Sequence, residues 1–125
     1  MEPSGSVWCV QASRSSVVTG ATDGSVRVWD IASGREQHSL MGHEDAVAGL
    51  QFDDRTIVTS GFDGTLRVWD WRTMRCRGVV RLVEASHREF RSLSTHSRRC
   101  TRLSMDEHKV VVGCIDGTIY CVDVY

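Results

Sequence analysis

The fold is decided by residues 59–70, Thr-Ser-Gly-Phe-Asp-Gly-Thr-Leu-Arg-Val-Trp-Asp. Asp63-Gly64 between two apolar runs is a strong β-hairpin signal, because glycine accepts a positive φ at no steric cost. After this turn, Leu66 and Val68 fall on one face of an extended strand, and Trp69 falls on the other. Bulky side chains on both faces predict a strand that is covered on both sides.

The chain repeats this pattern twice. Residues 19–30 (TGATDGSVRVWD) lie 40 residues upstream, and residues 112–123 (VGCIDGTIYCVD) lie 53 residues downstream. A period near 40 residues that ends in Trp-Asp is typical of β-propeller blades. Short apolar runs between evenly spaced Gly, Asp and Ser turns predict an all-β fold. We expect strands over 7–12, 17–19, 25–30, 35–41, 46–52, 56–60, 65–70 and roughly 75–82.

The repeats divide the chain into three units and an insertion. Unit 1 covers about 3–42, unit 2 about 43–82 and unit 3 about 96–125. Units 2 and 3 are separated by an insertion over about 83–95, which fits a short helix or an ordered loop equally well.

Composition narrows the class of protein. The 125 residues carry a net charge of -1, so the chain has no overall attraction to nucleic acid or to an anionic membrane. We find no run of about 18 apolar residues and expect no membrane span. The five cysteines form no Cys-x-x-Cys pair, which favours reduced thiols in a cytoplasmic or nuclear protein. No metal site and no cofactor is expected.

The stretch from Gly42-His43 to Trp69-Asp70 resembles a WD-repeat protein, and the resemblance covers nearly all of the chain. It implies a β-propeller, whose four-stranded antiparallel blades surround a central channel. The expected fold is therefore about three WD-repeat blades in an incomplete, open propeller. Closed propellers have about four to eight blades. We expect part of a longer propeller or a truncated isoform, and assembly with another chain is the alternative.

The resemblance implies a tetrad of His, Ser/Thr, Asp and Trp in each blade, joined by hydrogen bonds. A buried carboxylate needs donors, and a neutral imidazole donates from one nitrogen while it accepts on the other. Unit 2 supplies His43, Thr59, Asp63 and Trp69. The partial tetrads are Thr19, Asp23 and Trp29 in unit 1, which has Pro3 at the His position, and His96 and Asp116 in unit 3, which has Val112 and Val122 at the Thr and Trp positions.

The resemblance also implies a partner-binding surface at the blade tops. The positions implied to lie there are Thr22, Phe62 and Ile115, just before each turn Asp, with Asp45 and Arg98 at the start of inner strands. An exposed Phe62 suits a peptide hot spot. Packing of Phe62 on the neighbouring blade is an equal alternative.

Arginines dominate residues 72–102, which hold nine Arg and two Glu. A solvated surface explains such a segment, and a site for a phosphorylated or acidic peptide is the sharper alternative, because guanidinium groups bind phosphate bidentately. Few aromatic residues lie among these arginines, so nucleic acid is an unlikely partner. The candidate anion-binding residues are Arg88, Arg91, Arg98, Arg99 and Arg102.

The chain contains no motif that demands catalysis. We therefore expect a non-enzymatic scaffold that binds proteins or peptides. Residues 50–61 are similar to blades of the F-box/WD-repeat substrate adaptors, which implies a role in a ubiquitin-ligase adaptor. A propeller that binds nucleic acid or a phospho-ligand through 72–102 is one alternative. A fragment without independent function is the other.

Overall fold

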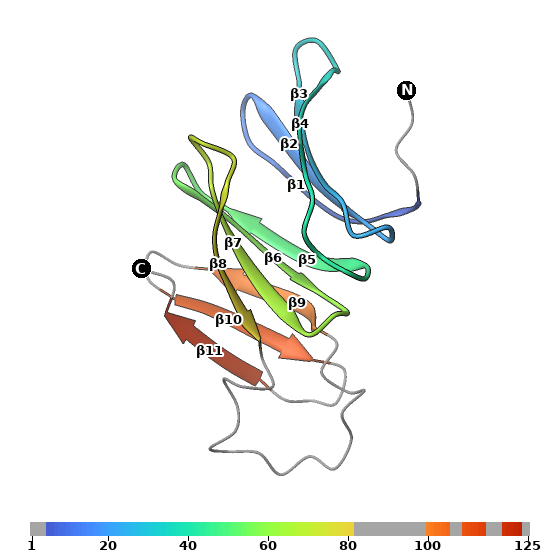
Figure 1. Ribbon diagram of the computed structural model, residues 1–125. Helices are drawn as coiled ribbons and strands as arrows, with labels where there is room; N and C mark the ends of the chain where they lie inside the picture. Colours follow the sequence, from blue (N-terminus) through green and yellow to red (C-terminus); the bar gives the residue numbers. More distant parts are fainter. Residues whose placement is uncertain (1–4, 82–99, 106–108, 115–118, 124–125) are drawn as a thin grey trace.

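The computed structural model describes residues 5–81, 100–105, 109–114 and 119–123 (Figure 1). The regular elements in these ranges are eleven β-strands in three antiparallel sheets. Blade 1 consists of β1 (Val7–Ala12), β2 (Ser16–Ala21), β3 (Val26–Asp30) and β4 (Glu36–Leu40). Blade 2 consists of β5 (Val47–Phe52), β6 (Thr56–Gly61), β7 (Thr65–Asp70) and β8 (Cys76–Arg81). Blade 3 contains β9 (Cys100–Met105), β10 (Lys109–Cys114) and β11 (Ile119–Asp123).

The expected fold class, an open all-β array of propeller blades, is confirmed. Each sheet is ordered as its strands follow in sequence, so every neighbouring pair forms a hairpin. The Asp-Gly turns close as the sequence predicts, with φ of 85° at Gly24 and 77° at Gly64. The insertion at 83–95 lies outside the described residues.

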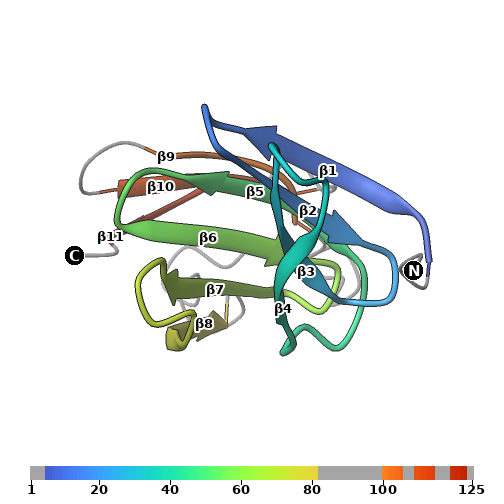
Figure 2. The same ribbon diagram turned by 90° about the horizontal axis from the view of Figure 1, so that it is seen from above.

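The blades stand side by side with their first strands together. Figure 2 shows β1, β5 and β9 along one side of the array, and β1 contacts β5 as β5 contacts β9. Each blade then extends away from this side, so β4 and β8 form the outer edges of blades 1 and 2.

Two apolar layers hold the blades together. Between blades 1 and 2, the buried side chains are Val18, Val26, Val28, Leu40, Val47, Leu50, Ile57 and Trp69. Between blades 2 and 3, they are Val58, Leu66, Val68, Leu103, Val110 and Val112. Leu66 and Trp69 thus face opposite layers, and β7 is covered on both sides. Full burial of each such side chain contributes about 1.5–3 kcal/mol.

The outer face of blade 1 is open. Val7 and Val10 are 48% and 62% exposed, whereas Val47 and Leu50, at the same positions of blade 2, are 0% and 6% exposed. The difference arises because blade 1 covers that face of blade 2. Val111 of blade 3 is likewise 42% exposed where its counterpart Val58 is 0% exposed.

A bulge interrupts the inner strand of blades 1 and 2 at the same place. The pairing of β1 with β2 shifts between Val7 and Cys9, so Trp8 is the extra residue of the bulge. The pairing of β5 with β6 shifts between Val47 and Gly49. A bulge changes the direction of a side chain without ending the strand.

A glycine accompanies each bulge, on alternate strands. In blade 1, Cys9 pairs with Gly20, and a Cβ on Gly20 would lie 2.5 Å from Val47 Cγ1 of blade 2 and 2.7 Å from the Cys9 sulfur. In blade 2, Gly49 pairs with Ser60, and a Cβ on Gly49 would lie 2.7 Å from the Ser60 hydroxyl oxygen. The space therefore admits one side chain per pair, and either strand can supply it.

Candidate functional site

The tetrad residues of blade 2 are joined by a chain of hydrogen bonds. The Trp69 indole donates to the Thr59 hydroxyl at 3.0 Å, and Thr59 Oγ1 lies 2.7 Å from His43 Nε2. His43 Nδ1 lies 3.1 Å from Asp63 Oδ2. These contacts fit an imidazole that accepts from Thr59 on Nε2 and donates to the carboxylate from Nδ1. The chain thus links β7, β6, the loop before β5 and the Asp63 turn.

Asp63 also organises the backbone around it. Its carboxylate accepts the Glu44 N–H at 2.9 Å, the Thr65 N–H at 3.0 Å and the Thr65 hydroxyl at 2.7 Å. The side chain is 8% exposed. Burial alone would raise the pKa of Asp63, but the hydrogen bonds from His43, Thr65 and Glu44 outweigh burial and hold that pKa well below its usual range.

Blade 1 contains a reduced version of this network. The Trp29 indole donates to the Thr19 hydroxyl at 3.0 Å, as in blade 2. Asp23 is exposed and accepts the Ser25 hydroxyl at 2.6 Å and the Ser25 N–H at 3.0 Å. The Ser25 hydroxyl is the main reason that the pKa of Asp23 is lowered. Pro3, at the position of the histidine, lies outside the described residues.

Blade 3 holds several of the predicted site residues, and most of them are not described. Val112 is fully buried on β10, and Val122 pairs with Val110 across β11 and β10. Arg102 lies in β9, paired with Gly113. The predicted residues outside the described ranges are His96, Asp116, Ile115, Arg88, Arg91, Arg98 and Arg99.

We call the end of blades 1 and 2 that carries the turns 22–25 and 61–65 and the loop 41–46 the Asp-Gly end. The structure brings three of the predicted partner-binding residues to this end. The Thr22 hydroxyl accepts the Ser6 N–H at 2.9 Å, and Asp45 is exposed and accepts the Ala46 N–H at 2.7 Å. Phe62 is half-buried.

The ring of Phe62 packs against Trp8 of the neighbouring blade, edge to face, with 5.2 Å between centroids. The Phe62 ring thus makes the contact with the neighbouring blade that is the alternative to a peptide hot spot. Trp8 itself is 51% exposed, so aromatic surface remains available at the Asp-Gly end. Trp8 is not predicted from the sequence as a binding residue, because the regular strand pattern around it gives no sign of the bulge that directs its side chain.

A groove of about 440 Å³ runs along the inner strands and includes Trp8. It is lined by Val7, Trp8, Cys9, Val10, Ala48, Gly49, Leu50, Gln51 and Leu103. Burial raises the pKa of the Cys9 thiol to about 11, so at neutral pH this group is a thiol and not a nucleophilic thiolate.

At the opposite end of the blades, a smaller cavity of about 380 Å³ lies beside the stacked rings of Phe52 and Trp71, whose centroids are 5.0 Å apart. Gln11 links the two blades there. Its amide nitrogen donates to the Phe52 carbonyl at 3.1 Å, and its amide oxygen accepts the Phe52 N–H at 3.0 Å.

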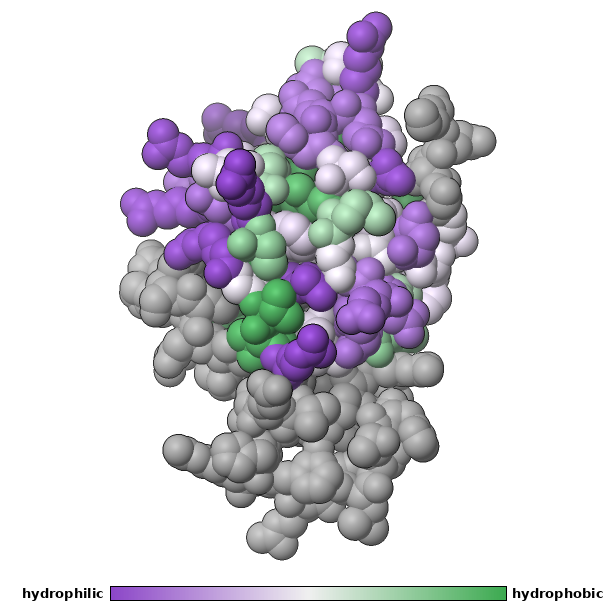
Figure 3. Space-filling model, viewed as in Figure 1, coloured by the Kyte–Doolittle hydropathy of each residue, from purple (hydrophilic) through white to green (hydrophobic). Residues whose placement is uncertain are grey.

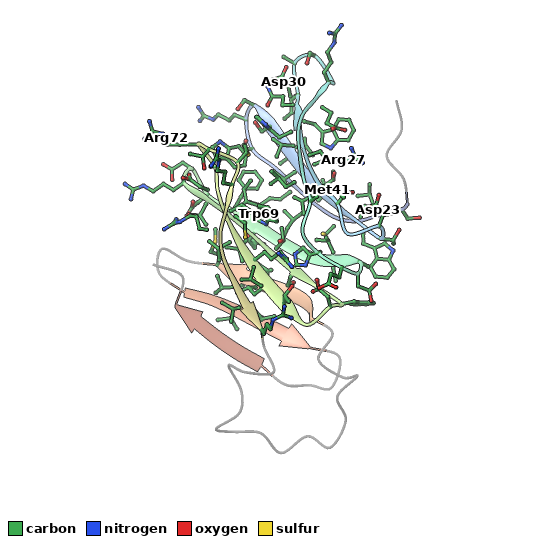
Figure 4. The ribbon with its side chains drawn as sticks, viewed as in Figure 1. Asp23, Arg27, Asp30, Met41, Trp69 and Arg72 are labelled. Atoms are coloured by element: carbon green, nitrogen blue, oxygen red, sulfur yellow. The ribbon has the colours of Figure 1, made fainter. Side chains whose placement is uncertain are left out.

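The two ends differ in charge. The three segments of the Asp-Gly end contain four carboxylates and no Lys or Arg. The loops of the opposite end, 13–15, 31–35, 53–55 and 71–75, contain five arginines and two aspartates. Asp23 and Arg72 mark the two ends in Figure 4, and hydrophilic side chains gather around the Arg72 end in Figure 3.

The part of the chain that the structure describes holds neither a metal-binding cluster nor a membrane-spanning helix. No three His, Cys, Asp or Glu side chains come together there as a metal site. The same residues contain no helix that is long and apolar enough to cross a membrane.

Comparison with protein families gives a match over more than half of the chain. The model described as "WD domain, G-beta repeat" matches residues 2–30 and 34–70. A curated relative, Mitochondrial division protein 1 of Malassezia globosa, is 37% identical over 113 residues, which cover 82% of this chain and 17% of the relative. The chain spans about 6 to 17% of the length of the curated relatives it matches.

Two solved structures align over nearly the whole chain. The computationally designed Ika4 protein is 32% identical with a TM-score of 0.74, and the alignment covers 95% of this chain and 66% of Ika4. The β-propeller domain of Myceliophteria thermophila Cps50 (Swd1) gives a TM-score of 0.78 at 19% identity, over 98% of this chain and 37% of that domain. The second likeness shows the fold alone.

Proposed function

Because the chain belongs to the WD40 family, whose propellers generally bind other proteins, we propose that it is a protein-interaction module with its binding surface at the Asp-Gly end of blades 1 and 2. Families of WD-repeat propellers are typically non-enzymatic scaffolds. This supports a role in which the chain holds a partner in place.

The observation that carries this proposal is the exposed Trp8. Large aromatic side chains dominate the binding energy of protein interfaces. Here the indole is half exposed, supported by Phe62 and continuous with the groove along the inner strands. A rigid network around His43 and Asp63 holds the loop 41–46 and the turn 61–65 next to it.

A capture experiment tests the proposal. The immobilised chain, Trp8→Ala and Trp71→Ala are incubated with cell extract, and bound proteins are quantified by mass spectrometry. Trp71 is the matched control, because it belongs to the aromatic pair at the opposite end. The proposal predicts proteins that Trp8→Ala loses and Trp71→Ala retains. Identical sets of bound proteins for the three chains would contradict it.

A narrower version of the proposal concerns the class of assembly. The similarity of residues 50–61 to F-box/WD-repeat adaptors supports a substrate-reading role in a ubiquitin ligase, in the cytoplasm or the nucleus. Recovery of ligase subunits among the Trp8-dependent proteins would support this role. A Trp8-dependent set without them would leave the general proposal standing and remove the narrower one.

The open blade faces support a second partner for the same chain. The exposed Val7 and Val10 occupy positions that are buried by a neighbouring blade in blade 2. A further blade, from a longer parent protein or another chain, suits this face. Light scattering tests assembly: a defined oligomer that Val10→Asp dissociates supports a partner chain, and a monomer unaffected by Val10→Asp excludes self-assembly through this face.

One observation favours a phospho-ligand as a second candidate function. Arg72, Arg75, Arg77 and Arg81 are all exposed around β8. Phosphate binds such groups strongly. Fluorescence anisotropy with a phosphoserine peptide and its serine counterpart tests this function, which requires tighter binding of the phosphorylated form and is contradicted by equal binding.

A further inference from the structure

We infer that the Asp-Gly end at the junction of blades 1 and 2 binds a polypeptide segment rich in Arg or Lys. This inference rests on the proposed function and names the chemistry of the partner. It follows from three features that meet at this end: an exposed indole, a set of carboxylates and the mouth of the groove along the inner strands.

The indole of Trp8 supplies the first feature. An Arg or Lys cation is attracted to the face of an aromatic ring, and Trp gives the strongest attraction. The edge-to-face contact with Phe62 fixes the orientation of the Trp8 ring, while 51% of the residue remains exposed. Trp8 is the bulge residue of β1 and therefore belongs to a strand and not to a loop. The strand holds the indole at the Asp-Gly end.

The carboxylates come from two segments whose backbones pack against each other. A Cβ on Gly24 would touch the His43 carbonyl and lie 3.1 Å from the Asp45 carbonyl oxygen, so the Asp23-Gly24 turn packs directly on the loop before β5. Asp23, Glu44 and Asp45 are all exposed.

Backbone hydrogen bonds join the segments that carry these carboxylates to the segments that carry Trp8 and Phe62. The Phe62 N–H donates to the Ala46 carbonyl at 2.9 Å, one residue after Asp45, and the Thr22 N–H donates to the Ser6 carbonyl at 2.9 Å, two residues before Trp8.

Three described arginines lie near this end. The charge of Arg27 helps to lower the pKa of Asp23, a Cβ on Gly42 would lie 3.0 Å from Arg67 Nη1, and Arg81 pairs with Thr65 at the end of β8. Within the three segments themselves, the charged side chains are all carboxylates.

The groove explains why a long cationic side chain fits better than a small ion. Trp8 contributes apolar surface to a groove whose lining is otherwise mainly polar, and β1 is an edge strand of its sheet. The methylene stem of Arg or Lys packs on apolar surface while its charge stays at a polar mouth. An acidic or phosphorylated segment would meet three exposed carboxylates here and be repelled.

Fluorescence anisotropy with synthetic peptides tests the inference. The probes are fluorescein-labelled octapeptides of alternating Gly with Arg, Gln or Glu, measured on the full chain at low salt. The Arg peptide is expected to bind, and the Gln and Glu peptides to bind at least about fivefold more weakly. Equal binding of the Arg and Gln peptides would overturn the inference.

Charge variants locate the site. The double variant Glu44→Gln/Asp45→Asn is expected to weaken the Arg peptide about fivefold, and Trp8→Ala to weaken it similarly. Asp53→Asn/Asp54→Asn removes the same charge at the opposite end and should leave the affinity unchanged. Equal losses from the two double variants would mean unspecific attraction and overturn the inference.

The outcome separates this inference from the proposed function. If Trp8→Ala loses proteins in the capture experiment but the Arg peptide does not bind, the surface binds a partner of another chemistry and only the cationic inference fails. If neither experiment depends on Trp8, the proposed surface itself is wrong. Urea unfolding of each variant shows that any loss comes from a folded chain.

Discussion

Blades 1 and 2 are built from the same pattern and differ in how tightly their Asp-Gly turns are held. Both have an Asp, a Thr and a Trp at matching positions, and in both the indole donates to the Thr hydroxyl at 3.0 Å. In blade 2, His43 continues this chain to Asp63, which also accepts hydrogen bonds from Glu44 and Thr65. In blade 1, Asp23 is exposed and its hydrogen bonds come from Ser25.

The comparison shows what the histidine adds. The Trp-Thr pair joins two strands of one sheet, whereas His43 brings in the loop that follows β4 of blade 1. Because this loop carries Glu44 and Asp45 and packs on Gly24, the network of blade 2 also fixes the junction between the blades. The exposed surface at the Asp-Gly end therefore rests on the buried polar network beneath it.

The largest expected effect is the difference between Asp63→Ala and Asp23→Ala. Asp63→Ala removes the acceptor of the Glu44 N–H, the Thr65 N–H and the Thr65 hydroxyl, and leaves the buried His43 Nδ1–H with only Thr65 Oγ1 at 3.2 Å, which costs about 3 kcal/mol of unfolding free energy. Asp23→Ala removes the acceptor of the Ser25 N–H and hydroxyl. Ser25 is 1% exposed, but Asp23 is exposed, so water reaches the position of the lost carboxylate and the cost is smaller, about 1 kcal/mol. Urea denaturation followed by tryptophan fluorescence measures both. Equal losses would mean that the buried network does not stabilise blade 2 beyond its turn.

The paired glycines give the next effect. Gly49→Ala brings a Cβ to 2.7 Å from the Ser60 hydroxyl and should cost about 1–2 kcal/mol by overpacking. Gly49→Ala/Ser60→Gly copies the arrangement of blade 1, where the side chain is on the inner strand, and should cost less than the sum of the single variants. A double-mutant cycle from urea unfolding measures this coupling. Additive losses would refute the compensation between the two positions.

A smaller effect is expected in the pH dependence of the unfolding free energy, to which Asp63 of blade 2 contributes. The pKa of Asp63 is lower in the folded chain than its unfolded value of about 4, so the unfolded chain takes up the proton first. The stabilisation by Asp63 is therefore present above pH ~4 and is lost as the pH falls towards the folded pKa. Asp63→Asn should flatten this fall in unfolding free energy, measured by urea titrations from pH 5 to pH 2.5. An unchanged slope would contradict the assignment.

The smallest effect is expected at an ion pair in blade 1. Blade 2 lacks one of the two residues that form it. Arg27 Nη1 lies 2.7 Å from Glu36 Oε1 in blade 1, and Cys76 replaces this Glu in blade 2. The pair is partly exposed, so Glu36→Gln should cost about 0.5 kcal/mol or less and nothing at high salt. Thermal unfolding at low and high salt checks this. A larger loss that persists in salt would assign Glu36 a structural role.

The sequence predicts much of the fold because its signals are local. Alternation in β7, the glycine turns and the repeat period each depend on residues close in the chain, and the predicted strands of blades 1 and 2 match the structure to within about two residues at each end. The burial of β7 on both sides also follows from its pattern.

The binding surface is less predictable, because it depends on contacts between blades. Trp8 sits in an ordinary apolar run, and only the register shift that places Val7 and Cys9 opposite successive residues reveals that it projects towards Phe62. Likewise, nothing in the sequence around Gln11 indicates its two hydrogen bonds to Phe52, which lies 41 residues away. Such pairings require the blade-to-blade arrangement, which local patterns do not encode.

The central claim, that His43 and its partners make the turn of blade 2 more rigid than that of blade 1, is tested most directly by native-state hydrogen exchange at two matched amides. Ser25 and Thr65 occupy the same position, and each donates its N–H to an Asp Oδ1 at 3.0 Å. We predict that the Thr65 amide exchanges at least about tenfold more slowly than the Ser25 amide, because opening its turn also breaks the bonds to His43 and Glu44. Equal exchange rates for the two amides would contradict the account.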